Sequence, residues 1–194
     1  ATVTPVLAGL ASRLCSMQAS SSVPSFCNCC LSRLPSGTLF QAAAAVPGTN
    51  VVWIAGAEYP TAPVVFERWS GGRWSAFPAP STPPRAYIRG MAAVGPGDLW
   101  AVGWSTSATG SPRPLAEHWN GVHWSVIPVP TPASQGRLEA VSARGSDDVW
   151  AVGSAGPAPL IEHWNGRRWH TISSPSLGAW AHLDGVTAVP RSPT

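Results

Sequence analysis

The feature that most constrains the fold of this chain is a tryptophan-marked unit that occurs three times. The first copy contains FQAAAAVPGTNVVWIAG and FERWSGGRWSAFPAP, the second IRGMAAVGPGDLWAVG and LAEHWNGVHWSVIPVP, and the third LEAVSARGSDDVWAVG and LIEHWNGRRWHTISSP. A partial fourth copy begins at Leu183 with LDGVTAV. Units that recur every 45 to 50 residues are typical of repeat architectures, in which each unit is one supersecondary element.

Each unit is predicted to form four short antiparallel strands, which we name A to D. Strand A is a small apolar run, strand B carries one tryptophan, strand C ends on a second and strand D carries a third. These tryptophans are Trp53, Trp69 and Trp74 in the first unit, Trp100, Trp119 and Trp124 in the second, and Trp150, Trp164 and Trp169 in the third. Gly-Gly or Asn-Gly separates strand C from strand D in every copy, which favours a tight hairpin because these residues tolerate positive φ. Four short strands per unit are typical of a β-propeller blade.

The composition favours an all-β fold. The 194 residues include 19 Gly and 21 Pro, which exclude long helices, and no run of eighteen apolar residues is present to span a membrane. We therefore predict a partial β-propeller of three four-stranded antiparallel blades plus the first strand of a fourth. The blades are expected at about 38–82, 87–132 and 137–177, with the partial fourth at 182–194.

The DVWAVG and EHWNG..W elements resemble the tryptophan-rich, kelch-like propeller repeats of secreted bacterial proteins, which are distantly similar to the galactose oxidase propeller. The resemblance covers residues 38–189, and its VWAV and W.G..W elements also resemble tectonin-type lectin propellers, whose repeats are shorter. It implies an extracellular or cell-surface location but says little about activity, because propellers carry many unrelated functions. The copper and cofactor residues of the oxidase family have no counterpart here, so we expect no cofactor.

Variation between the units predicts where a ligand would bind. The step from the strand B to the strand C tryptophan is 16, 19 and 14 residues, whereas the step from strand C to strand D is 5 in all three units. The B–C loops, and the D–A connections that emerge at the same end of a meander, are therefore the candidate binding face. Aromatic and arginine side chains there suit stacking on sugar rings or docking a peptide. The candidate ligand-binding residues are Tyr59, Arg85, Tyr87, Trp104, Arg113, Arg137, Trp180 and His182.

Other motifs favour structural roles. In the EHW motifs at 117–119 and 162–164, neighbouring residues of a strand point to opposite faces, so the Glu and His of one copy are not expected to share a metal ion. We expect the Glu to meet backbone or Arg groups and the His to pack between blades. The Asp147-Asp148 pair falls in an A–B turn, where Asp is typical.

The charge pattern argues against a nucleic-acid partner. All twelve basic residues are arginine, nine acids oppose them, and the net charge is only +3. The lack of lysine also excludes the lysine-dependent phosphate loop and Schiff-base chemistry. Arg beside Trp at 68–69, 73–74 and 167–169 offers a stacking groove for a single strand, but cation–π pairing on an outer strand is the simpler expectation.

Residues 1–37 lie outside the repeat pattern and are expected to be a poorly ordered leader. They contain all four cysteines of the chain, Cys15, Cys27, Cys29 and Cys30. The CNCC spacing is wrong for a CxxC zinc knuckle, so two disulfides of open connectivity are the alternative. Closed propellers use four to eight blades, so we expect either a piece of a longer propeller or an array that closes by self-association.

These observations predict a non-catalytic extracellular binding or scaffold module, with a glycan or cell-wall polymer as the first ligand and a protein as the second. No GxSxG nucleophile motif or HExxH zinc helix is present. The alternative is a propeller enzyme of the lyase or glycosidase type. Such an enzyme needs acids near the central channel, where strand A supplies only Glu139 and Asp184.

Overall fold

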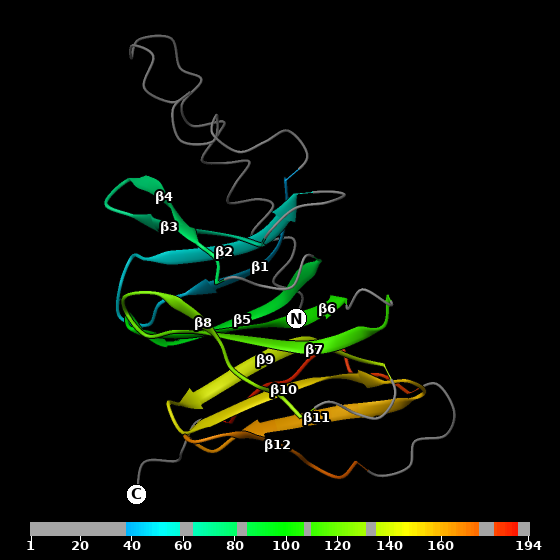
Figure 1. Ribbon diagram of the computed structural model, residues 1–194. Helices are drawn as coiled ribbons and strands as arrows, with labels where there is room; N and C mark the ends of the chain where they lie inside the picture. The colour runs from blue at the N-terminus through cyan, green and yellow to red at the C-terminus, as the bar shows by residue number, and fades with distance from the viewer. Residues whose placement is uncertain are drawn as a thin grey trace, which may run out of the picture. The chain divides into compact units, whose positions relative to one another are not determined.

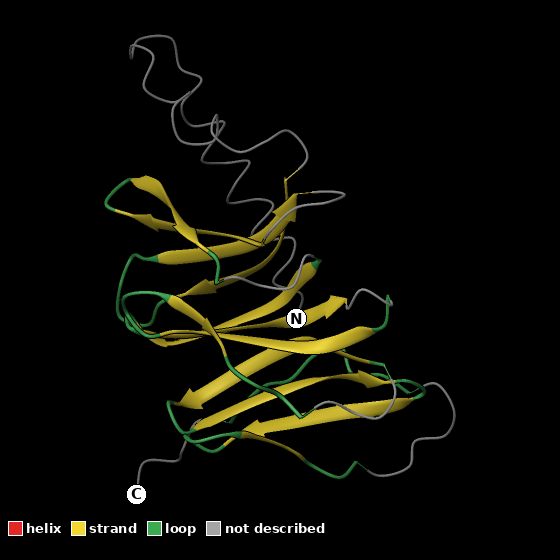
Figure 2. Ribbon diagram, in the orientation of Figure 1, coloured by secondary structure: helices red, strands yellow, loops and turns green. Residues whose placement is uncertain are grey.

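The computed structural model describes residues 38–58, 64–80, 85–106, 110–130, 135–174 and 181–189 (Figure 1). Strands make up the regular structure of these residues, and none of them lies in a helix (Figure 2). Within this part of the chain there is accordingly no helix that would cross a membrane. The predictions for residues 1–37, including the four cysteines, lie outside the described residues, as do Tyr59 and Trp180.

The described strands form three four-stranded antiparallel sheets, each a meander in which the pairing order follows the chain order. Sheet 1 contains β1 (Thr38–Ala45), β2 (Val52–Glu58), β3 (Val64–Ser70) and β4 (Arg73–Pro78). Sheet 2 contains β5 (Ala86–Gly95), β6 (Asp98–Thr106), β7 (Pro112–Trp119) and β8 (Trp124–Val126). Sheet 3 contains β9 (Gly136–Gly145), β10 (Asp148–Ala155), β11 (Ala158–Trp164) and β12 (Trp169–Thr171). The predicted all-β fold with three four-stranded units is confirmed, and strands A to D are the four strands of each sheet.

Glycine and asparagine shape the hairpins between strands C and D. In sheet 1, Gly71 and Gly72 both adopt positive φ, at 59° and 80°, as a two-residue turn requires. In sheets 2 and 3, Gly121 and Gly166 also adopt positive φ, at 94° and 86°. In sheet 2, the side-chain oxygen of Asn120 in addition accepts two backbone N–H bonds, each 3.0 Å long, and Asn165 accepts the equivalent pair in sheet 3. All three turns therefore use a glycine with positive φ, and the Asn-Gly turns add a side-chain acceptor.

The inner strand of every sheet contains a one-residue bulge. Pairing with strand B skips Gln41 in β1, Arg89 in β5 and Glu139 in β9. A bulge leaves one residue unpaired and redirects its side chain. The three bulges therefore set a polar side chain at the same level of each inner strand.

The bulge explains why strand B of every unit ends its motif on glycine. A Cβ added to Gly103 would collide with the backbone carbonyl of Tyr87 and lie 3.0 Å from the Cα of Ile88. Gly56 and Gly153 meet the same obstacle in sheets 1 and 3. Only a residue without a Cβ allows this approach of the two backbones.

Two apolar cores hold the sheets together, one between sheets 1 and 2 and one between sheets 2 and 3. Because neighbouring residues of a strand point to opposite faces, β6 contributes to both. Leu99 and Ala101 lie in the first core, whereas Trp100 and Val102 lie in the second. The strand B motif of sheet 2 is therefore apolar at every position, since both faces of that sheet are covered.

Residues 181–189 lie against sheet 3 without forming a strand. The backbone N–H of Leu183 donates to the carbonyl of Gly153 at 3.2 Å, and that of Ala188 donates to Ser142 Oγ at 2.9 Å. These partners belong to β10 and β9, so the segment contacts sheet 3 as β9 contacts β6 and β5 of sheet 2. The segment lies where the inner strand of a following sheet would lie, but among the described residues no strand pairs with it.

Candidate functional site

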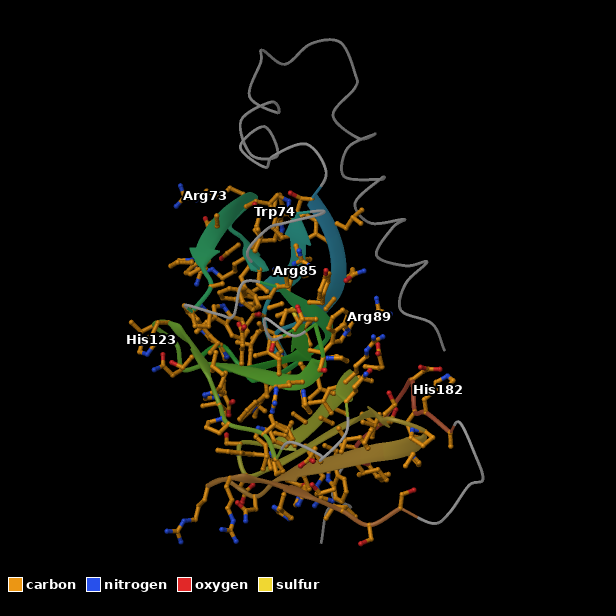
Figure 3. All side chains as sticks on the ribbon, turned by 45° about the vertical axis from the view of Figure 1, so that its right-hand side comes forward. Arg73, Trp74, Arg85, Arg89, His123 and His182 are labelled. Atoms are coloured by element: carbon orange, nitrogen blue, oxygen red, sulfur yellow. The ribbon has the colours of Figure 1, made fainter. Side chains whose placement is uncertain are left out.

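In each sheet, strand B ends and strands A and C begin at one end, and the A–B and C–D turns lie at the other (Figure 1). In sheet 2, Ala86 at the start of β5 lies opposite Ser105 near the end of β6. Figure 3 places Arg89 and His182 on one side of the sheets and His123, which lies in a C–D turn, on the opposite side. We name the end with the B–C and D–A connections the loop end.

A stack of three side chains lies at the loop end between sheets 2 and 3. Tyr87 of β5 and Trp104 of β6 are cross-strand partners whose ring centroids are 4.2 Å apart, with 27° between the ring planes. Arg137 of β9 brings its guanidinium carbon to 4.6 Å from the centroid of the Trp104 ring. This cation–π contact ties the inner strand of one sheet to strand B of the previous sheet. We call these three residues the loop-end stack.

The equivalent cross-strand pairs in the other sheets differ completely in chemistry. They are Leu39 with Ala57 in sheet 1 and Arg137 with Ser154 in sheet 3. Residues that differ between units at one structural position are not required by the scaffold. The loop-end stack is therefore a feature of this chain and not a requirement of the four-stranded unit.

The bulge residues of the inner strands form a second feature that sequence reasoning missed. Arg89 Nε lies 3.0 Å from Glu139 Oε2, so the bulges of sheets 2 and 3 are joined by an ion pair. Its side chains are 43% and 20% exposed, so solvent weakens the attraction. The signal in the sequence was a polar residue directly before the small residue of strand A in every unit, including Asp184 in the partial fourth.

An open hollow of about 430 Å³ lies beside the loop-end stack and shares Arg137 with it. Its lining residues are Arg137, Glu139, Ser154, Gly156, Ala181, His182 and Asp184. His182 Nε2 and Asp184 Oδ2 are 3.3 Å apart, and both side chains are largely exposed. The hollow therefore combines carboxylates, a guanidinium, an imidazole and a hydroxyl, all of which can hydrogen-bond a polar ligand.

The structure does not bring all the predicted residues together. Arg113 is exposed on β7, two residues before Leu115, which packs in the core between sheets 1 and 2. Strand alternation therefore directs Arg113 toward sheet 1, whereas Trp104 faces sheet 3. Arg85 is exposed directly before β5 at the loop end. The six described candidates thus divide into four residues of the stack and hollow and two outlying arginines.

The strand C glutamates are buried inside the sheets, where Glu67, Glu117 and Glu162 are 3%, 0% and 0% exposed. Burial raises the pKa of Glu117 to about 8. Burial also raises the pKa of Glu162, to about 7, and a hydrogen bond from Thr171 opposes that rise. The expectation that these glutamates meet Arg or backbone groups is wrong for Glu117, whose carboxylate oxygens have no hydrogen-bond partner among the described residues. Glu117 shares the face of Leu115 and Trp119 on β7, which packs in the apolar core between sheets 1 and 2.

The histidines of the EHW motifs pack on the strand B tryptophans. The ring of His118 lies 4.5 Å from that of Trp100, and its Nε2 lies 2.9 Å from Asp98 Oδ1. His163 repeats both contacts in sheet 3, where Asp148 Oδ1 is 3.0 Å from its Nε2. The A–B turn aspartates thus orient histidines against tryptophans, which is a structural role.

The described residues contain no group of three His, Cys, Asp or Glu side chains arranged to hold a metal ion. No protein-family profile matches the chain, and no curated protein sequence matches it. The chemistry of the loop end is therefore the basis for assigning a function.

Proposed function

We propose that this chain is a non-catalytic binding module of the propeller type, whose loop end binds a glycan or cell-wall polymer outside the cell. One observation carries the proposal. The stack of Tyr87, Trp104 and Arg137 lies beside a hollow of about 430 Å³ that polar side chains line. Aromatic surface next to a few convergent hydrogen-bonding groups is typical of small-ligand sites.

The side chains of the hollow suit a ligand rich in hydroxyl groups. The carboxylates of Glu139 and Asp184 accept hydrogen bonds, Arg137 donates them through a planar fork, and His182 can do either. Charges of both signs line the hollow, since the guanidinium of Arg137 lies there with the carboxylates of Glu139 and Asp184. A mixed lining of this kind favours a neutral, polyhydroxylated ligand over a polyanion such as nucleic acid.

The loop-end stack gives Trp104 a positioning role in this proposal. Its ring already contacts Tyr87 on its own sheet and Arg137 on the next, so it is not a bare platform for a sugar. Instead it holds the exposed guanidinium of Arg137 at the rim of the hollow. A side chain fixed before binding loses less conformational entropy when the ligand arrives.

The location and the wider architecture rest on the repeats. Three tryptophan-rich meanders in succession support the propeller assignment, and their resemblance to repeats of secreted bacterial proteins supports an extracellular or cell-surface location. Self-association and a protein ligand remain the other proposed partnerships.

The proposal is tested by co-sedimentation of the chain with insoluble peptidoglycan, chitin and cellulose. Asp184→Ala and Arg137→Ala are compared with Arg167→Ala, which removes an exposed arginine from the C–D turn of sheet 3 at the opposite end. We expect both loop-end variants to lose binding at least about tenfold, which corresponds to about 1.4 kcal/mol, while Arg167→Ala binds as the unmodified chain does. Equal binding by all four proteins, or by none of them to any polymer, would overturn the proposed site.

A further inference from the structure

The same tryptophan joint connects both pairs of neighbouring sheets. Trp53 of sheet 1 packs against Trp119 and Trp124 of sheet 2, with ring centroids 4.9 and 5.6 Å apart. In the second joint, Trp100 of sheet 2 packs against the strand C and strand D tryptophans of sheet 3 at 4.9 and 5.2 Å. Each joint thus places one strand B tryptophan against a tryptophan pair from the next sheet.

The outer surface of sheet 1 carries the strand C and strand D tryptophan pair of such a joint, but among the described residues no strand B tryptophan packs on that pair. Trp69 and Trp74 form the pair there, with ring centroids 5.5 Å apart, and no third tryptophan packs on them among the described residues. Figure 3 shows Trp74 at the end of the stacked sheets that is farthest from sheet 3. By strand register, this outer face holds the apolar residues Phe40, Val52, Ile54, Val65, Trp69 and Trp74, with Glu67 between Val65 and Trp69.

Exposure shows that the apolar side chains of this face are accessible. All six are partly exposed, whereas Glu67 among them is 3% exposed. Their counterparts in sheet 2, where sheet 1 covers the equivalent face, are buried: Ile88 and Leu99 are 0% exposed, and Trp119 and Trp124 are 2% and 3% exposed. The same side-chain positions are therefore core in sheet 2 and surface in sheet 1.

The outer surface of sheet 3 carries the other part of such a joint, a strand B tryptophan. Trp150 is partly exposed there and contacts His163 at 4.3 Å, as Trp100 contacts its own histidine inside the second joint. Ile161 and Ile172 lie on the same face and are also partly exposed. The described sheets thus present a strand B tryptophan on one outer face and a tryptophan pair of strands C and D on the other.

We propose that two copies of this chain associate head to tail, with Trp150 of each copy packed between the partner's Trp69 and Trp74. The two internal joints are the template, because the outer faces present the same register positions and the same residue types. A contact between two different surfaces of identical chains forms a ring when the rotation closes. Two copies supply six four-stranded sheets, which lies within the four to eight blades of closed propellers. This inference does not depend on the ligand proposed above.

Residues 183–189 define how the partner sits on sheet 3. The segment LDGVTAVP at 183–190 aligns without a gap with FQAAAAVP at 40–47, which contains most of β1. It lies on β9 and β10, where the inner strand of a following sheet belongs. In the proposed joint, β1 of the partner takes this place and the segment is displaced.

The test is light scattering on a sizing column with the complete chain at tens of micromolar. Val65→Glu places a charge on the outer face of sheet 1, and Ile161→Arg places one on the outer face of sheet 3. Val122→Glu is the control, because Val122 is 79% exposed in the C–D turn of sheet 2. We expect the unmodified chain and the control at twice the 20.2 kDa mass of one chain, and each face variant alone at 20.2 kDa.

Mixing the two face variants distinguishes a head-to-tail joint from any symmetric one. A Val65→Glu copy retains its sheet 3 face and an Ile161→Arg copy retains its sheet 1 face, so the mixture regains one intact joint and a mass of two chains. Trp74→Ser and Trp150→Ser form a second pair for the same mixing experiment, and near-ultraviolet circular dichroism confirms that each variant is folded. A monomeric unmodified chain, face variants that still associate alone, or a mixture that stays monomeric would each overturn the proposal.

Discussion

Thr171 donates its hydroxyl to the buried carboxylate of Glu162, with 2.7 Å between Thr171 Oγ1 and Glu162 Oε1. The equivalent residue opposite Glu117 in sheet 2 is Val126, which has no donor. Burial raises the pKa of both glutamates, to about 7 for Glu162 and about 8 for Glu117, and the hydrogen bond from Thr171 opposes the rise only at Glu162. The two sheets therefore offer a comparison in which one buried glutamate has a side-chain donor and the other has none.

The first prediction adds a hydroxyl opposite Glu117, as Thr171 supplies one opposite Glu162. Val126→Thr should lower the pKa of Glu117 and raise the free energy of unfolding at pH 8.5 by about 1.5–3 kcal/mol, because hydrogen bonds to charged groups are worth about that much. At pH 5, where Glu117 is protonated, the gain should be smaller. Urea denaturation at the two pH values measures both, with Val122→Thr as an exposed control. A gain of equal size at both pH values would show that the hydroxyl does not act through the carboxylate.

The second prediction concerns the pH dependence of stability. Burial raises the pKa of Glu117 from 4.5 to about 8, so between these values the folded state binds more protons than the unfolded state. The stability that Glu117 contributes is therefore fully present below pH 4.5 and is lost as the pH rises toward 8. Glu162 contributes with the same sign up to about pH 7, so the fall between pH 7 and 8 belongs mainly to Glu117.

Glu117→Gln should remove this last part of the fall. The free energy of unfolding of the unmodified chain should decrease by roughly 1.4 kcal/mol per pH unit in that window, and the variant should be nearly flat. Glu139→Gln, in the ion pair with Arg89, serves as the control and should leave the slope unchanged. The same slope in Glu117→Gln as in the unmodified chain would assign the pH dependence to other groups.

The third prediction concerns the inner-strand bulge. Gly103→Ala should destabilise the chain by at least about 2 kcal/mol, because its Cβ meets the backbone of Tyr87 and cannot be relieved by a rotamer change. Gly95→Ala in the neighbouring strand is the matched control, since nothing lies within 4 Å of a Cβ there. Thermal and urea unfolding of the two variants measure the difference. Equal stabilities would mean that the bulge shifts freely.

The fourth prediction compares one position in two surroundings. Trp100 is 1% exposed in the joint between sheets 2 and 3, whereas Trp150 is partly exposed on the outer face of sheet 3. Trp100→Leu should cost about 3 kcal/mol through the cavity that it leaves, and Trp150→Leu should cost less than about half of that. Both are measured in dilute solution, so that the proposed association does not contribute. A larger loss from Trp150→Leu would contradict the lower burial of Trp150.

Much of the fold was predictable because its signals are local and repeated. The Gly-Gly and Asn-Gly dipeptides place the C–D turns, and the alternation of side chains along each strand separates Glu117 from His118 on opposite faces. The bulges were not predicted, although the glycine three residues after each strand B tryptophan marks the place where the bulged backbone approaches strand B. A skipped residue changes register without changing the residue types around it.

The sequence by itself determined the three units, their four strands and the end at which variable loops emerge, because turns and strand periodicity depend on residues close in the chain. Only the tertiary structure decided which side chains meet. It set Arg137 on Trp104, joined Arg89 to Glu139, and separated Arg113 from both. These outcomes depend on how one sheet stacks on the next, and stacking is fixed by apolar packing over whole faces and not by any single motif.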